Sequence, residues 1–167
     1  MAVAGCSTEQ ASKQVSEAPL QVAATTGMVA DLLRNVGGKH VEIQQVMGAG
    51  VDPHLYKATR DDVQTIMSAD AVFYSGLMLE GKMADTLMKV GRTRPVFAVT
   101  ELIDESQLLE PDDAPGHPDP HVWMDVAAWS ECIDAVADAL VELLPAHAKD
   151  ITANAGVYRQ RLAALED

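Results

Sequence analysis

The stretch "LQVAATTGMVADLLRNVGGKHVEIQQVM", residues 20–47, decides the fold class. Its apolar start, residues 20–26, is typical of a buried strand, and Thr26 is placed to cap a helix running from about Gly27 to Val36. Residues 40–47 then alternate between polar and apolar side chains, which predicts a second strand. A strand, a helix and a second strand in succession indicate a βα unit with parallel strands.

The same alternation of strand-like and helix-like segments continues along the chain. The segment from Thr59 to Asp62 resembles a capping box, in which the first side chain and the fourth cap each other's backbone. The sequence therefore predicts an α/β fold, a (β/α) lobe around a four-stranded, mainly parallel sheet. The further predicted strands are residues 71–76 and 95–100, and the further predicted helices are residues 59–68, 79–90 and 125–144.

The last segment, residues 146–167, is predicted to be a helix with Ile151, Tyr158, Leu162 and Leu165 on one stripe. It reaches the acidic pair Glu166-Asp167 without a Gly, Asn or Pro stop signal. Two acidic groups have the wrong sign for the negative end of a helix dipole. We therefore expect this helix to continue in the natural protein, with a frayed natural terminus as the alternative.

Length and charge bound the class of protein. A chain of 167 residues is long enough for one domain with a substantial core. The formal net charge of −13 argues against binding of nucleic acid, which draws its affinity from Lys and Arg on phosphates. No apolar run approaches the roughly 20 residues that a membrane-spanning helix needs. The protein is expected to contact a membrane only through a lipid anchor.

The two cysteines are expected to differ in role. The sequence around Cys6, Val3-Ala4-Gly5-Cys6, resembles the bacterial lipobox, in which the cysteine carries the lipid. Residues 1–19 would then form a flexible tether, because they hold too little apolar surface to fold. The charged and apolar parts of a signal peptide are missing, so either the start is truncated or Met1 was added. A disordered tail with an incidental cysteine is the alternative. Cys132 is predicted to be a small buried hydrophobe.

Two loops carry the same Asp-Pro-His triplet: "DPHLYKATRDD" begins at Asp52 and "HPDPHVWMD" begins at His117. Both His54 and His121 fall where a loop leads into a helix, at the edge of the predicted sheet where ligands bind in α/β proteins. The preceding prolines stiffen the backbone, which favours imidazoles already pointed at a shared metal ion. A single loop histidine is more often a surface residue than a ligand. The two matching contexts leave a shared metal site and a surface role both open.

A metal-bound histidine needs a partner for its other ring nitrogen, and Asp52, Asp119 and Asp125 are the candidates. Asp125 is equally suited to be a plain helix N-cap. His117 is interpreted as a loop residue, and the two other histidines, at 40 and 147, show no partner that suggests a site. Two histidines do not complete a metal site, so further ligands must come from elsewhere.

At this point the sequence resembles a known family. Residues 48–83 and 119–130 are similar to the cluster A-I metal-binding lipoproteins, the solute-binding proteins of bacterial manganese and zinc ABC importers. The resemblance covers roughly residues 20–167. It implies two (β/α) lobes joined by one long rigid helix, with the metal between the lobes. Residues 20–145 would be the N-terminal lobe and residues 146–167 the start of the linking helix.

By matching motif positions, the resemblance makes His54 and His121 the two metal ligands of this lobe. The family's other ligands, a His or Glu and then an Asp, would come from a C-terminal lobe that has no counterpart here. This chain would therefore form half a site. Zinc members often carry a His-rich loop before the second ligand, whereas residues 104–120 are acidic with one histidine. This mildly favours manganese, or mixed binding of manganese, zinc and iron.

The expected function is capture of Mn²⁺ or Zn²⁺ outside the cytoplasm, in the periplasm or at the cell surface, for delivery to a cognate ABC permease. No catalysis is expected. One alternative is a metal-dependent hydrolase, although neither histidine motif carries the Glu of H-E-x-x-H that would act as general base. Another is a surface adhesin lipoprotein whose metal is structural.

Overall fold

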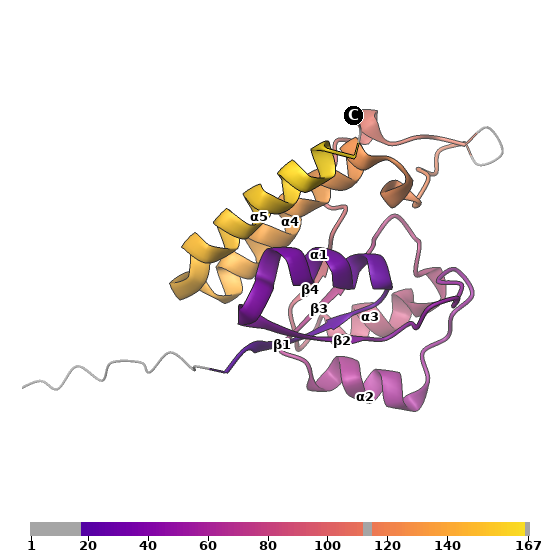
Figure 1. Cartoon of the computed structure of the whole chain (residues 1–167). Coiled ribbons are helices and arrows are strands. Elements are labelled where there is room, and N and C mark those ends of the chain that lie inside the picture. Colours follow the sequence, from indigo (N-terminus) through magenta and orange to yellow (C-terminus); the bar gives the residue numbers. More distant parts are fainter. Residues whose placement is uncertain (1–17, 112–114, 166–167) are drawn as a thin grey trace, which may run out of the picture.

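The computed structural model describes residues 18–111 and 115–165, and its centre is a parallel sheet of four strands (Figure 1). The strand order is β2-β1-β3-β4, and each neighbouring pair is parallel. The predicted fold class is therefore confirmed. The strands are β1 (Leu20–Ala24), β2 (Val41–Gln45), β3 (Ala71–Tyr74) and β4 (Val96–Ala98).

Helices cover both faces of the sheet (Figure 1). One hydrophobic cluster joins the sheet to α1, α4 and α5, and a second, smaller cluster joins it to α2 and α3. Within the described residues, no helix is long and apolar enough to cross a membrane. The α-helices are α1 (Gly27–Gly37), α2 (Arg60–Ser68), α3 (Ala84–Val90), α4 (Val126–Leu143) and α5 (Ala148–Ala163). Short 3-10 helices are η1 (Gly38–His40), η2 (Gly81–Met83), η3 (Glu105–Gln107), η4 (Val122–Met124) and η5 (Pro145–His147).

Local capping signals placed the starts of α1, α2 and α4 correctly. The Thr26 hydroxyl accepts a hydrogen bond from the backbone N–H of Val29 at the start of α1. At the start of α2, Thr59 and Asp62 form the predicted capping box. These side chains satisfy backbone donors that a helix leaves unpaired in its first turn. Because each helix start follows the end of a strand, the caps also fix where the intervening loops turn.

The predicted helix over residues 79–90 begins later in the structure, and the reason is a tight turn after β3. Glu80 is buried, and its carboxylate accepts hydrogen bonds from the backbone N–H groups of Ser75 and Gly76 and from the Thr25 hydroxyl. Gly76 has a φ of 98°, and a Cβ there would collide with Thr100. The backbone thus folds back on itself before η2 and α3 can start.

Helix α5 is packed into the lobe, not held apart from it. Ile151, Tyr158 and Leu162 are buried in the same cluster as α1 and α4. The Tyr158 hydroxyl donates to Asp31 on α1 at 2.7 Å, and burial followed by the Asp31 carboxylate raises the pKa of Tyr158. Helix α5 ends at Ala163, short of the predicted run to residue 167, and residues 166–167 lie outside the described part. Its role as the start of a linking helix stays a prediction.

The two cysteines differ in what the structure says of them. Cys6 lies outside the described residues, so its lipidation stays a prediction. Cys132 is fully buried on α4 in the main cluster, which confirms its predicted place.

We expect Cys132 to resist thiol reagents in the folded protein. Burial raises the pKa of its thiol to about 12, so about one thiol in ten thousand is ionised at pH 8. In a Cys6→Ser background, labelling with a maleimide at pH 8 should be undetectable in buffer and complete in denaturant. Rapid labelling without denaturant would show that α4 opens readily or packs differently.

Candidate metal centre

The structure brings His54 and His121 together at the carboxyl edge of the sheet. His54 lies on the loop from β2 to α2, and His121 ends the long connection from β4 to η4 and α4. Their Nε2 atoms are 3.2 Å apart, and the two rings are tilted by 58° with centroids 5.2 Å apart. Two residues 67 positions apart in the chain therefore point the same ring nitrogen at one small volume.

The repeated Asp-Pro-His triplet forms the same turn in both loops. The Asp52 carboxylate accepts a hydrogen bond from the backbone N–H of His54 at 2.9 Å. Asp119 accepts from the backbone N–H of His121 at the same distance. Proline has no N–H, so the histidine supplies the first donor after the aspartate, and the side chain closes over the proline. This shared turn explains why the three residue types recur in that order.

Asp119 also orients the imidazole of His121. Its carboxylate lies 2.6 Å from Nδ1 of that ring, which places the ring proton on Nδ1 and leaves the Nε2 lone pair facing Nε2 of His54. The backbone N–H of His121, and then its ring, lower the pKa of Asp119. A histidine held by a carboxylate on one nitrogen with the other nitrogen open is the usual arrangement of a metal ligand.

The distance between the two Nε2 atoms fits a shared ion. Two nitrogen ligands at about 2.0–2.1 Å from one tetrahedral ion lie about 3.3–3.4 Å from each other. The His121 side chain is 43% exposed, so the site is open to solvent on one side. Among the described residues, no group of three or more His, Cys, Asp or Glu side chains is assembled that could hold a metal ion. The pair therefore supplies two ligands and leaves the rest of a coordination sphere open.

Neighbouring side chains hold both histidine loops. The Tyr56 hydroxyl donates to Asp62 at 2.6 Å, which ties the His54 loop to the first turn of α2. Burial raises the pKa of Asp62, but the hydrogen bonds from Tyr56 and Thr59 outweigh it and lower the pKa overall. The Trp123 ring lies edge-on to the His121 ring at 5.3 Å. Each of these aromatic residues follows a histidine of the pair by two positions in the sequence, and packing beside the site is the role expected of it from that position.

The other predicted residues have different surroundings. Asp125 accepts a hydrogen bond from the backbone N–H of Ala128, so it caps α4, the alternative that the sequence left open. Asp52 bonds the backbone of His54, and no bond from it to an imidazole is present in the described part of the chain. His117 is exposed in the bend before Pro118. Asp119 is thus the carboxylate that reaches an imidazole of the pair.

Comparison with known proteins identifies the family. The family model described as "Zinc-uptake complex component A periplasmic" matches residues 22–167. The chain belongs to this family. Within it, the chain is 42% identical over 165 residues to the manganese-binding lipoprotein MntA of Bacillus subtilis, covering 99% of this chain and 53% of the relative. It is 42% identical over 145 residues to the zinc-binding protein TroA of Treponema pallidum, and the match covers 87% of this chain and 46% of that relative.

Solved structures agree with the sequence comparison. The structure of the periplasmic zinc-binding protein TroA from Treponema pallidum superposes with a TM-score of 0.83 at 41% identity. It covers 88% of this chain and 52% of that one. The chain therefore spans about half the length of the relatives it matches.

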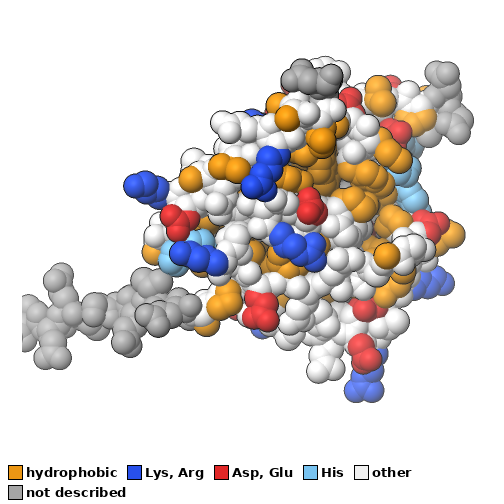
Figure 2. Space-filling view, in the orientation of Figure 1, with side chains coloured by type: hydrophobic (Ala, Val, Ile, Leu, Met, Phe, Trp, Pro, Cys, Tyr) orange, Lys and Arg blue, Asp and Glu red, His pale blue; other side chains and the backbone are white. Residues whose placement is uncertain are grey.

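This family member also has a second histidine pair, which sequence reasoning did not find. The rings of His40 and His147 stack with centroids 4.1 Å apart, and His40 Nε2 lies 2.9 Å from a carboxylate oxygen of Asp150. His40 precedes β2, whereas His54 follows it, so the two pairs lie at opposite edges of the sheet. Figure 2 shows histidine side chains on two opposite sides of the molecule. The second pair fastens the start of α5 to the sheet.

Proposed function

We propose that this chain captures Mn²⁺ or Zn²⁺ through His54 and His121, as the N-terminal half of an extracytoplasmic solute-binding protein that delivers the ion to an ABC importer. The observation that carries the proposal is the 3.2 Å separation of the two Nε2 atoms, with Asp119 on the far nitrogen of His121. Imidazole nitrogen suits zinc and other transition metals better than it suits Mg²⁺ or Ca²⁺. The membership of the family supports the same assignment.

The remaining ligands would come from a second half that follows α5. Relatives are about twice as long as this chain, and the pair leaves coordination positions open. Large apolar side chains also lie exposed on the loops and on η4 at the same edge of the sheet, a pattern typical of a surface that another body covers. They are Leu55, Met78, Leu102, Leu109 and Met124. An additional carboxylate ligand would favour Mn²⁺ and an additional imidazole would favour Zn²⁺.

The lipid anchor and the permease complete the proposal. Curated relatives are named as lipoproteins, and we propose that Cys6 carries the lipid and residues 1–19 form the tether. The metal ion would be cargo, bound outside the cytoplasm and passed to the permease. A hydrolase would need a third ligand and a general base beside the ion. The family to which the chain belongs is one of metal uptake, which favours transport.

The test is a calorimetric titration of the chelator-treated protein with MnCl₂, ZnCl₂ and MgCl₂. We expect one Mn²⁺ or Zn²⁺ per chain with saturable heat, and none with Mg²⁺. Restoring the second half should tighten binding by about a hundredfold or more, because two further ligands complete the coordination sphere. Absence of saturable heat with both transition metals in both forms of the protein would disprove the proposal.

A further inference from the structure

Buried serine, threonine and carboxylate side chains gather at one place in the described part of the chain. That place is the carboxyl edge of the sheet, where β1, β3 and β4 end. The strand order reverses there, because β1 connects through α1 to its neighbour on one side and β2 returns through α2 to its neighbour on the other. In α/β sheets, ligands bind at such a reversal. The buried residues are Thr25, Thr26, Ser75, Glu80 and Thr100.

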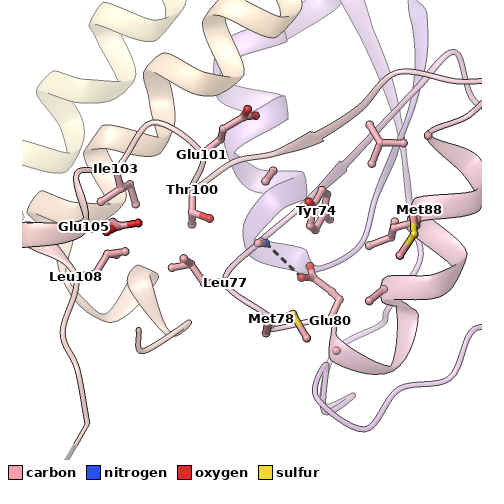
Figure 3. A pocket seen from close by; sticks show the side chains of 17 residues that line it. Tyr74, Leu77, Met78, Glu80, Met88, Thr100, Glu101, Ile103, Glu105 and Leu108 are labelled. Carbon is pink, nitrogen blue, oxygen red and sulfur yellow. Dashed lines mark hydrogen bonds between the residues drawn. The ribbon is translucent and has the colours of Figure 1, made fainter. Parts of the chain in front are cut away.

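The Glu80 carboxylate joins the ends of two strands of this sheet. One of its oxygens accepts hydrogen bonds from the Thr25 hydroxyl at 2.6 Å and from the backbone N–H of Ser75 at 2.7 Å. The dashed line in Figure 3 marks the third bond, which the backbone N–H of Gly76 donates to the other oxygen. Burying a carboxylate costs free energy unless hydrogen bonds replace its water. Glu80, which is 3% exposed, is therefore a link between β1 and β3 and not a part of the apolar core.

The residue that Glu80 binds after β1 also holds the start of the loop that carries His54. The carbonyl oxygen of Thr25 accepts a hydrogen bond from the backbone N–H of Met47 at 2.9 Å. Met47 is buried in the smaller hydrophobic cluster, on the α2 and α3 face of the sheet. The His54 loop therefore leaves the sheet from a point that Thr25 holds.

The residue that Glu80 binds after β3 holds the start of the connection to His121 in the same way. The carbonyl oxygen of Ser75 accepts hydrogen bonds from the Thr100 hydroxyl at 2.8 Å and from the Thr100 backbone N–H at 3.3 Å. At the other end of this connection, Val122 is buried in the main hydrophobic cluster, on the α1 and α4 face. The two histidine loops are thus anchored on opposite faces of the sheet.

We propose that Glu80 is a positioning residue for the metal pair: by joining the end of β1 to the end of β3, it sets the separation of His54 and His121. Each Asp-Pro-His triplet fixes a histidine within its own loop, and each loop is packed on its own face of the sheet. What relates one loop to the other is the junction of β1 with β3, and Glu80 closes that junction. Metal–nitrogen distances tolerate a change of only about 0.2 Å, so a small shift of one loop weakens a shared site. The inference rests on the proposed function.

The first experiment removes the hydroxyl that bonds Glu80. Thr25→Val keeps the shape of the side chain, and Ser75→Ala is the matched control, because the buried Ser75 hydroxyl has no hydrogen-bond partner among the described residues. Calorimetry follows binding of ZnCl₂ to each chelator-treated variant, and urea unfolding in chelator measures its stability. We expect the Zn²⁺ affinity to fall about tenfold in Thr25→Val and to stay parental in Ser75→Ala. Thr25→Ser, which restores the hydroxyl, should recover the parental affinity.

Glu80→Gln tests the carboxylate itself. The amide offers one acceptor oxygen in place of two, so at least one of the three donors loses its bond. We expect the Zn²⁺ affinity of this variant to fall by about tenfold or more. Thr25→Val decides the question if Glu80→Gln does not fold.

A spectroscopic measurement separates positioning from stability. Long-range ¹H–¹⁵N correlations of the imidazole rings show when each Nε2 binds Zn²⁺. In the parent, the signals of His54 and His121 should change together as Zn²⁺ is added, because the two rings share one ion. In Thr25→Val, the two signals should change at different Zn²⁺ concentrations. A variant that is only less stable would keep the joint change.

Each other outcome overturns the inference. Parental affinity in both Thr25→Val and Glu80→Gln would show that the metal pair does not depend on the link. An equal loss in Ser75→Ala, or no recovery in Thr25→Ser, would show that the cluster acts only through packing. A parent that binds no Zn²⁺ would refute the proposed function, whereas a parent that binds Zn²⁺ no better than the variants refutes this inference alone.

Discussion

Replacing His54 or His121 with alanine is expected to abolish saturable binding of Mn²⁺ and Zn²⁺ by this chain. The described residues assemble two candidate ligands, and either substitution leaves one. A single imidazole on a protein surface does not hold a transition metal with useful affinity, because the ion keeps most of its water. Calorimetry on each variant, with the parent alongside, measures the effect.

Matched controls are available in the same chain. His117→Ala removes an exposed loop histidine four positions before His121, and His40→Ala removes one at the opposite edge of the sheet. Both should bind metal as the parent does. Asp119→Asn keeps the ligand but weakens its orientation, so its affinity should fall by about 10- to 100-fold. Binding that survives in both His54→Ala and His121→Ala, or that disappears in His117→Ala, would place the site elsewhere.

The sequence could place His54 and His121 at one edge of the sheet because the signal is local. Each Asp-Pro-His triplet predicts a stiff turn. Because each turn lies between a strand and the following helix, both are expected at the same edge of a parallel sheet. What it could not predict is the 3.2 Å separation, since that depends on the strand order and on how the long connection from β4 crosses the edge. The sequence could not predict the contact of His40 with His147 for the same reason. It joins residues on separate elements, and neither residue carries a local motif.

The fold was predictable where neighbouring residues settle the outcome. Thr26, Thr59 and Asp125 cap helices at the expected positions because a cap depends on a few adjacent residues. The start of α3 was predicted too early because a contact between segments far apart in the sequence determines where this helix begins. The Glu80 carboxylate is pulled into the turn by Thr25, which belongs to the end of another strand. Leu77 and Met78, in the same turn, have left-handed backbone conformations that helix propensity does not indicate.

Replacing Phe73 with alanine is expected to lower the free energy of unfolding by about 3–5 kcal/mol. Phe73 is fully buried on β3, a central strand, and its ring stacks on that of Phe97 at 5.1 Å. Deleting the ring loses its burial and leaves a cavity that a parallel sheet covered on both faces cannot easily close. Because domains of this size are stable by about 5–15 kcal/mol, the variant should unfold at a much lower urea concentration.

Phe97→Ala is the matched control, because Phe97 is half-buried on the edge strand β4 and the same atoms are removed. The decrease in the free energy of unfolding should be roughly half as large for Phe97→Ala, since less apolar surface leaves water on folding at that position. Equal losses at the two positions would contradict the difference in burial between the two rings.

Unfolding measured with and without saturating Zn²⁺ distinguishes a loss of core packing from a loss of metal binding. A ligand that binds only the folded state raises the free energy of unfolding by an amount set by its concentration and affinity. Phe73→Ala should unfold easily yet gain the same increment from Zn²⁺ as the parent, because its ring lies in the sheet core and not at the histidine pair. His121→Ala should show the reverse, near-parental stability in chelator and no increment with Zn²⁺. If Phe73→Ala lost the increment while still folded, the geometry of the pair would depend on the core of the sheet and not on the two proline-braced loops.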